Sequence, residues 1–94
     1  MVKHVLFCKL KDYEKAEELK NVFLSMKGKV PMAVDVKSGV DFLRSERSFD
    51  VMLEVTLNSR ADLDAYQCDP YHCDVVKTYV HSVVEKSATV DYEY

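Results

Sequence analysis

The chain has 94 residues, of which 48% are hydrophobic and 31% charged, and its formal net charge is -3. This length suits one domain spanning residues 1–94, and the composition excludes a disordered chain. The acidic balance also excludes a nucleic-acid partner, because a phosphate backbone is held by a basic surface.

The first predicted element is a strand over Val2–Leu10, in which apolar residues occur on both sides of a period-two alternation. Val5 and Phe7 lie on one side, and the other side carries His4, Leu6 and Cys8. A helix is predicted next, because Asp12 is a suitable N-terminal cap and Gly28 a suitable stop. Its apolar stripe consists of Ala16, Leu19, Val22, Phe23 and Met26.

Two strands are predicted after Pro31. In the first, polar residues alternate with Val34, Val36, Ser38, Val40 and Phe42. The second is the clearest strand of the chain, with one side formed by Phe49, Val51, Leu53, Val55 and Leu57.

The last third of the sequence predicts a broken helical segment followed by a strand. Ser59 and Asp62 approximate a capping box, so a short helix should turn Leu63 and Tyr66 inward before Pro70 interrupts it. One side of the helix that follows carries His72, Val76, Tyr79, Val80 and Val83. In the final strand, polar residues alternate with Ala88, Val90, Tyr92 and Tyr94.

This order of elements predicts an α+β fold, namely a ferredoxin-like βαββαβ arrangement with a four-stranded antiparallel sheet. Both helices should cover one face of the sheet. We assign to that face Val5, Phe7, Val51, Leu53, Val55, Val90 and Tyr92. The opposite face would then carry His4, Leu6, Cys8, Met52, Glu54, Thr56, Thr89 and Asp91.

The opposite face is too apolar for open solvent and too polar for a dry core. We expect the same face of a second copy to cover it, which gives a homodimeric α+β barrel with a cavity for a small molecule. The cavity would be lined by Leu6, Cys8, Met52, Glu54 and Asp91. The alternative is a one-sided sheet whose second face simply meets water.

The start of the chain gives no sign of a targeting segment, because Lys9 and Lys11 follow the first apolar residues too soon for a signal peptide. No apolar run approaches membrane-spanning length. The cysteines Cys8, Cys68 and Cys73 lack the spacing of a disulfide framework. We therefore expect free thiols, a cytoplasmic location and no membrane partner.

Two histidines are candidates for acid–base chemistry. His4, beside Glu54 or Asp91, would be held in one tautomer near neutral pH. His72 lies near the start of a helix, where the helix dipole favours the neutral base, and Tyr66 should lie close to it. The alternative for both histidines is a purely structural role.

A zinc site is not predicted from Cys68, His72 and Cys73. The two cysteines have no second pair of ligands elsewhere, and adjacent residues of a helix point in different directions. We expect neither a metal nor a cofactor, and Cys8 should be a small buried apolar residue.

Four segments in order resemble the stress-responsive dimeric α/β barrel (Dabb) family: the first strand from Lys3 to Asp12, the strand Phe49–Leu57, the junction Asp64–His72, and Val90–Tyr92. The resemblance implies a homodimer of ferredoxin-like subunits with a cavity in each. In the polyketide cyclase of this family a histidine and a tyrosine at this junction are catalytic, and they match His72 and Tyr66. A histidine lining the cyclase pocket matches His4, whereas its first-helix tyrosine is replaced by an apolar residue, which we take to be Phe23.

Two functions follow as hypotheses. In the first, His72 removes a proton from a carbon next to a carbonyl in a polyketide-like substrate, while His4 and Tyr66 position that substrate. In the second, the dimer binds a ligand or protects against stress without catalysis. Whether the protein is an enzyme is left open by the sequence.

Overall fold

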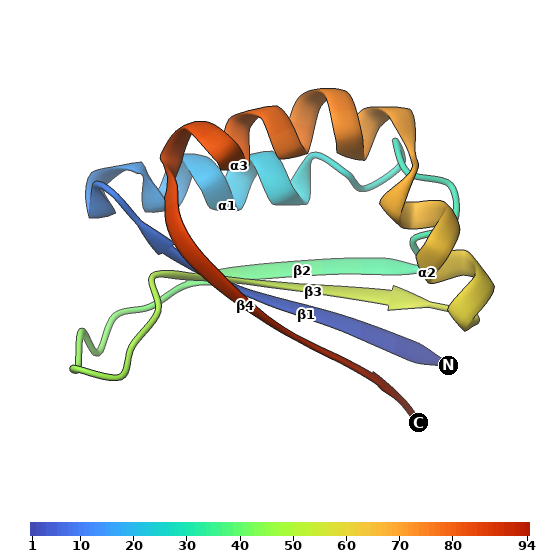
Figure 1. Ribbon diagram of the computed structural model, residues 1–94, viewed down its shortest axis with the longest axis horizontal. Coiled ribbons are helices and arrows are strands. Elements are labelled where there is room, and N and C mark those ends of the chain that lie inside the picture. The colour runs from blue at the N-terminus through green and yellow to red at the C-terminus, as the bar shows by residue number, and fades with distance from the viewer.

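Four antiparallel strands form one sheet in the order β2-β3-β1-β4, and the helices lie on one of its faces (Figure 1). The computed structural model describes residues 1–94. Its elements are β1 (Val2–Leu10), the short helix η1 (Tyr13–Lys15), α1 (Ala16–Leu24), β2 (Asp35–Val40), β3 (Val51–Leu57), α2 (Arg60–Gln67), the π-helical turn η2 (His72–Val76), α3 (Lys77–Val83) and β4 (Val84–Glu93). The predicted ferredoxin-like α+β fold is confirmed.

Side-chain caps begin the helices where the sequence predicts them. The Asp12 carboxylate accepts the N–H of Glu14, and the Ser59 hydroxyl accepts the N–H of Asp62. After α1, a series of turns reaches Gly28, whose φ of 76° is readily adopted only by glycine. Strands β2 and β3 are shorter than predicted, since Phe42 and Phe49 lie outside them.

The register between β1 and β3 corrects the predicted division of the two sheet faces. Leu6 lies opposite Leu53 and Cys8 opposite Val51, so these residues share the face that the helices cover. Val5 and Phe7 therefore lie on the other, uncovered face. The prediction that grouped them with Leu53 was wrong, because β1 is a central strand with apolar residues on both sides and its alternation alone does not say which side faces inward.

The same correction applies to β4. Asp91 pairs with His4 and Thr89 with Leu6, which places them on the helix-covered face. Val90 and Tyr92, predicted to face the helices, lie on the uncovered face with exposed fractions of 55% and 45%. Met52, Glu54 and Thr56 do lie on the uncovered face, as predicted. Three ionisable residues, His4, Glu54 and Asp91, are predicted to lie together on that face. Only Glu54 lies there, so this prediction was wrong.

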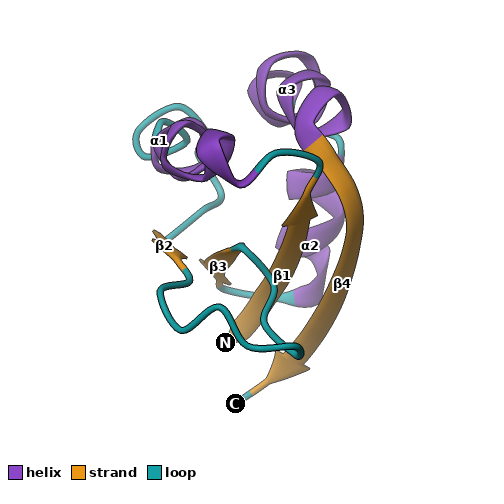
Figure 2. Ribbon diagram, turned by 90° about the vertical axis from the view of Figure 1, so that its left-hand side faces the viewer, coloured by secondary structure: helices purple, strands orange, loops and turns teal.

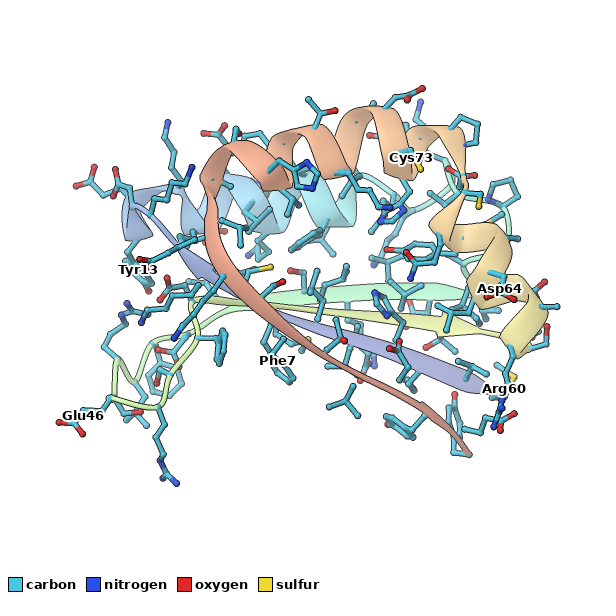
Figure 3. All side chains as sticks on the ribbon, viewed as in Figure 1. Phe7, Tyr13, Glu46, Arg60, Asp64 and Cys73 are labelled. Carbon is cyan, nitrogen blue, oxygen red and sulfur yellow. The ribbon has the colours of Figure 1, made fainter.

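The hydrophobic core fills the space between the sheet and the helices (Figure 2). Its largest fully buried side chains include Tyr66, Phe23, Leu19, Met26 and Leu53. On the opposite side of the sheet no element of the chain covers the strands, and Phe7 points away from the helices there (Figure 3). No helix combines the length and the apolar character that crossing a membrane requires.

A sharp corner at Asp69 and Pro70 separates α2 from η2. The Asp69 side chain accepts the N–H of His72 at 3.1 Å, which caps the new helical turn. The predicted interruption at Pro70 is therefore present. However, the turn that follows it, His72–Val76, is π-helical, and the sequence pattern does not predict this.

A buried carboxylate connects the β2–β3 loop to the sheet. Asp50, 2% exposed, accepts the N–H of Leu10 at 2.7 Å and a guanidinium N–H of Arg44 at 2.7 Å. Burial alone raises the pKa of Asp50, but these two hydrogen bonds, with the charges of Arg44 and Lys9, hold its pKa below the ordinary value. Arg44 also lies over the Tyr13 ring, 3.7 Å from its centroid.

Replacing Asp50 by Ala should lower the free energy of unfolding by about 2–3 kcal/mol, because the buried Leu10 N–H loses its acceptor. Since the folded state lowers the pKa of Asp50, its contribution is present above the ordinary carboxyl pKa and is lost as the pH falls below it. Urea unfolding at several pH values measures both effects. Asp64→Ala, at an exposed site, is the control, and equal stability of the two variants contradicts this role.

Candidate functional site

A cavity of about 550 Å³ lies between the helices and the covered face of the sheet. Its apolar walls come from β1, α1, β3, the η2–α3 segment and the start of β4: Leu6, Phe23, Leu53, Val76, Val80 and Val84. Two of the predicted catalytic residues, His4 and His72, also line it. This cavity is formed by one subunit and is partly open, whereas the face assignment predicts a cavity between the sheets of two subunits.

His72 and Tyr66 lie side by side across the corner between α2 and η2. Their rings stack with centroids 4.2 Å apart and planes inclined by 26°. Tyr66 is fully buried, and its hydroxyl points at the sulfur of Met26, 3.8 Å away. Tyr66 therefore orients the His72 imidazole through ring contact, while its hydroxyl is directed into the core.

The imidazole of His72 is held neutral. Burial is the main cause and the positive charge of Lys77 adds to it, so that the pKa of His72 falls to about 4. The neutral form predicted from the helix dipole is thus favoured mainly by burial. Nδ1 of His72 is buried and has no hydrogen-bond partner in the protein, while another part of the residue lines the cavity.

His4 is held by Asp91. The distance from His4 Nδ1 to Asp91 Oδ1 is 2.5 Å, and a carboxylate accepts, so Nδ1 carries the proton. The ring of His4 also lies 5.5 Å from that of Tyr66, measured between centroids. The structure thus brings His4, Tyr66 and His72 into one row, with Nε2 of His4 left for another partner.

The other residues predicted to line the cavity are dispersed. Leu6 and Phe23 are in its wall. Cys8 is buried in the core, and burial raises the pKa of its thiol to about 11. Met52 and Glu54 lie on the uncovered face, where Glu54 accepts a hydrogen bond from Lys3 at 3.3 Å. No group of three or more His, Cys, Asp or Glu side chains is placed to hold a metal ion.

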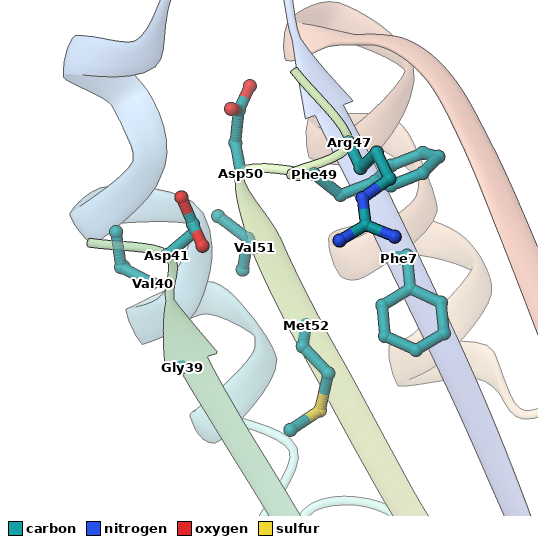
Figure 4. Close-up of a pocket in the computed structure, with 9 residues that line it drawn as sticks. All are labelled: Phe7, Gly39, Val40, Asp41, Arg47, Phe49, Asp50, Val51 and Met52. Carbon is teal, nitrogen blue, oxygen red and sulfur yellow. The ribbon is translucent and has the colours of Figure 1, made fainter. Parts of the chain in front are cut away.

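A second hollow, of about 560 Å³, lies at the end of the uncovered face (Figure 4). Phe7, Met52 and Phe49 form much of its apolar wall, and Arg47 extends over it. It contains no histidine or cysteine. Its residues continue the apolar surface of the sheet, so it belongs to that surface and not to the histidine row.

Sequence reasoning missed Lys77, which lines the histidine cavity. In a regular α-helix a residue five positions after His72 is rotated from it by about 140°. The π-helical turn reduces this rotation, and no residue pattern indicated such a turn. Lys77 also lies three and four positions before Val80 and His81, which line the same cavity.

Comparison with protein families shows a match over residues 2–94 to the family described as the stress responsive A/B barrel domain (Dabb). Comparison with curated proteins finds no match. Thus the family resemblance inferred from four segments extends over almost the whole chain.

Solved structures show the same fold. A dimeric protein of unknown function with a ferredoxin-like fold from Bacteroides fragilis is 23% identical, with a TM-score of 0.82 over 99% of this chain and 95% of that chain. A protein from Arabidopsis thaliana is 24% identical, with a TM-score of 0.84 over 100% and 95%. A hydroxynitrile lyase from Passiflora edulis is 19% identical, with a TM-score of 0.79 over 97% and 90%. At these identities the likeness is one of fold.

The lowered pKa of His72 predicts a pH dependence of stability. The unfolded imidazole binds its proton near pH 6.5 and the folded one only near pH 4, so the free energy of unfolding should fall as the pH drops between these values. Urea unfolding of the wild type and of His72→Phe, which keeps a ring against Tyr66, measures this change. The variant should lose less stability across this window, and equal loss in both proteins would contradict a neutral buried His72.

Proposed function

The chain belongs to the stress-responsive A/B barrel family, and we propose that it is a homodimer whose subunits each bind a small molecule and carry out acid–base chemistry on a carbonyl or polyketide-like substrate. The observation that carries the proposal is the neutral His72 imidazole, stacked on Tyr66 in the wall of an apolar cavity. A general base must be unprotonated at the working pH, and His72 meets this condition at neutral pH, while its lowered pKa also makes it a weaker proton acceptor than a free imidazole.

In the proposed step, His72 takes a proton from the carbon next to the substrate carbonyl. The negative charge that develops on the carbonyl oxygen needs a hydrogen-bond donor. His4 lies in the cavity wall with its Nδ1–H held by Asp91, and a donation from its Nε2 would require the doubly protonated ring, whose Nδ1–H Asp91 still accepts. Tyr66 keeps the plane of His72 fixed, and no cofactor takes part in the step.

Dimer formation is proposed through the uncovered face of the sheet. Exposed Val90 and Tyr92 on β4, with Phe7 on β1 and Met52 on β3, make this face apolar. The chain covers it only at one end, where the β2–β3 loop brings Phe49 beside Phe7. Contiguous apolar surface of this kind marks an interface. The Bacteroides fragilis relative is described as dimeric, which supports the same arrangement here.

A lysine in place of Val90 should separate the subunits. Twofold symmetry would bury the introduced charge twice, and burying an unpaired charge costs several kcal/mol, so the dissociation constant should rise about 100-fold or more. Sedimentation at micromolar concentration measures this. Val75→Lys, an equally simple change at an exposed valine of η2, is the control and should remain dimeric. A wild-type monomer would refute the proposed dimer.

Proton removal can be tested without knowing the natural substrate. In D₂O the wild-type protein should accelerate deuterium incorporation next to the carbonyl of 4-phenyl-2-butanone, followed by ¹H NMR. His72→Gln should lower the rate by about 100-fold or more, as expected for loss of a general base. Cys68→Ser, at an exposed site outside the cavity, should retain the wild-type rate. Exchange at the wild-type rate in His72→Gln would contradict the assignment.

The alternative function is a non-catalytic ligand-binding or stress-protective dimer. One observation favours it: the hydroxyl of Tyr66 points at Met26, so it does not act on a molecule in the cavity. Saturable binding of the ketone without any deuterium exchange would support this alternative and exclude the proposed proton transfer.

A further inference from the structure

Lys77 projects a positive charge into the histidine cavity that no acidic side chain of the chain neutralises. It is the first residue of α3, half-buried, and forms no ion pair within 4.0 Å. The other half-buried lysines each have an acidic side chain within 4.0 Å. Lys3 binds Glu54 and Lys9 approaches Asp50. The Lys77 ammonium group is therefore free to form a charge-assisted hydrogen bond with an anion in the cavity.

The π-helical turn places this charge. Its i→i+5 hydrogen bond runs from the N–H of Lys77 to the carbonyl of His72, so Lys77 follows His72 on the same side of the helix. The effect of the Lys77 charge on the pKa of His72 agrees with this proximity. The ammonium group and the proposed base therefore face the same space.

The rest of the cavity wall does not offer a counter-charge nearby. Glu85 is the one acidic residue in it, and it lies in β4, just beyond the far end of α3 and beside Lys86. Along a helix, eight residues correspond to about 12 Å. Asp69 is closer to His72, but its carboxylate accepts the backbone N–H of that residue. Gln67, next to the corner, adds an amide that can donate a hydrogen bond to an anion.

We propose that Lys77 is the anion-recognition residue of this cavity, and that its ligand is a carboxylic acid with an apolar chain or ring. The carboxylate would meet Lys77 and Gln67 near the corner, and the apolar part would lie against Phe23, Leu53 and Val80. Two lysines line the cavity without an ion pair, but Lys86 is exposed and only Lys77 is half-buried. One partly desolvated ammonium balances one negative charge, which favours a monocarboxylate over a polyanion. This inference rests on the cavity of the proposed function but not on proton transfer by His72.

Calorimetric titration with 5-phenylpentanoate and with its uncharged amide, 5-phenylpentanamide, tests the inference. The wild-type protein should bind the carboxylate at least tenfold more tightly than the amide. Lys77→Met should abolish this preference and leave affinity for the amide within about twofold, whereas Lys77→Arg should retain the preference. Lys27→Met, at an exposed lysine outside the cavity, is the matched control. NMR titration adds a second readout, because loss of the nearby charge should raise the pKa of His72.

The outcomes separate this inference from the proposed function. Equal binding of both compounds by the wild type, or a preference that survives in Lys77→Met, overturns the role of Lys77 alone. A carboxylate preference together with no deuterium exchange from any ketone supports Lys77 and overturns proton transfer by His72. Binding of neither compound overturns both the ligand class and the binding cavity.

Discussion

The corner at Asp69 and Pro70 is the constraint on which the geometry of the cavity depends. Proline has no backbone N–H and cannot continue α2, so the chain must start a new helical turn, and the Asp69 carboxylate caps it at His72. This brings the two rings of Tyr66 and His72 together although they belong to different helical segments. The π-helical turn that follows then directs Lys77 to the same side as His72. One local break in a helix thus positions the stacked pair and the charge beside it.

Strand β1 contributes side chains to both faces of the sheet. It lies between β3 and β4, and its side chains alternate between the helix-covered face, with His4 and Leu6, and the uncovered face, with Val5 and Phe7. The first face contains the cavity and the second the apolar surface proposed for dimer formation. Because both surfaces share one strand, a shift of its register by one residue would move His4 out of the cavity and Phe7 into it. The pairing of β1 with both β3 and β4 fixes this register.

The two histidines of the cavity have different surroundings. His72 is desolvated and faces a lysine, so its neutral form is favoured. His4 donates its Nδ1–H to the Asp91 carboxylate, which fixes the orientation of its ring. The proposed function gives the two residues different roles, His72 as the base and His4 as a positioning group. The two imidazoles thus differ in their surroundings and not in residue type.

The sequence by itself determined the order of elements, the caps at Asp12 and Ser59, the break at Pro70 and the family, because these depend on local backbone preferences and on periodicity. It also identified His4, Tyr66 and His72 as candidates. Only the tertiary structure decided which side of β1 and β4 faces the helices, since both sides of β1 are apolar and register is a property of paired strands. In this arrangement His4 pairs with Asp91, Glu54 lies on the other face of the sheet, and a single subunit forms the cavity. Lys77 lines the cavity directly after the π-helical turn, and no repeat in the sequence indicates such a turn.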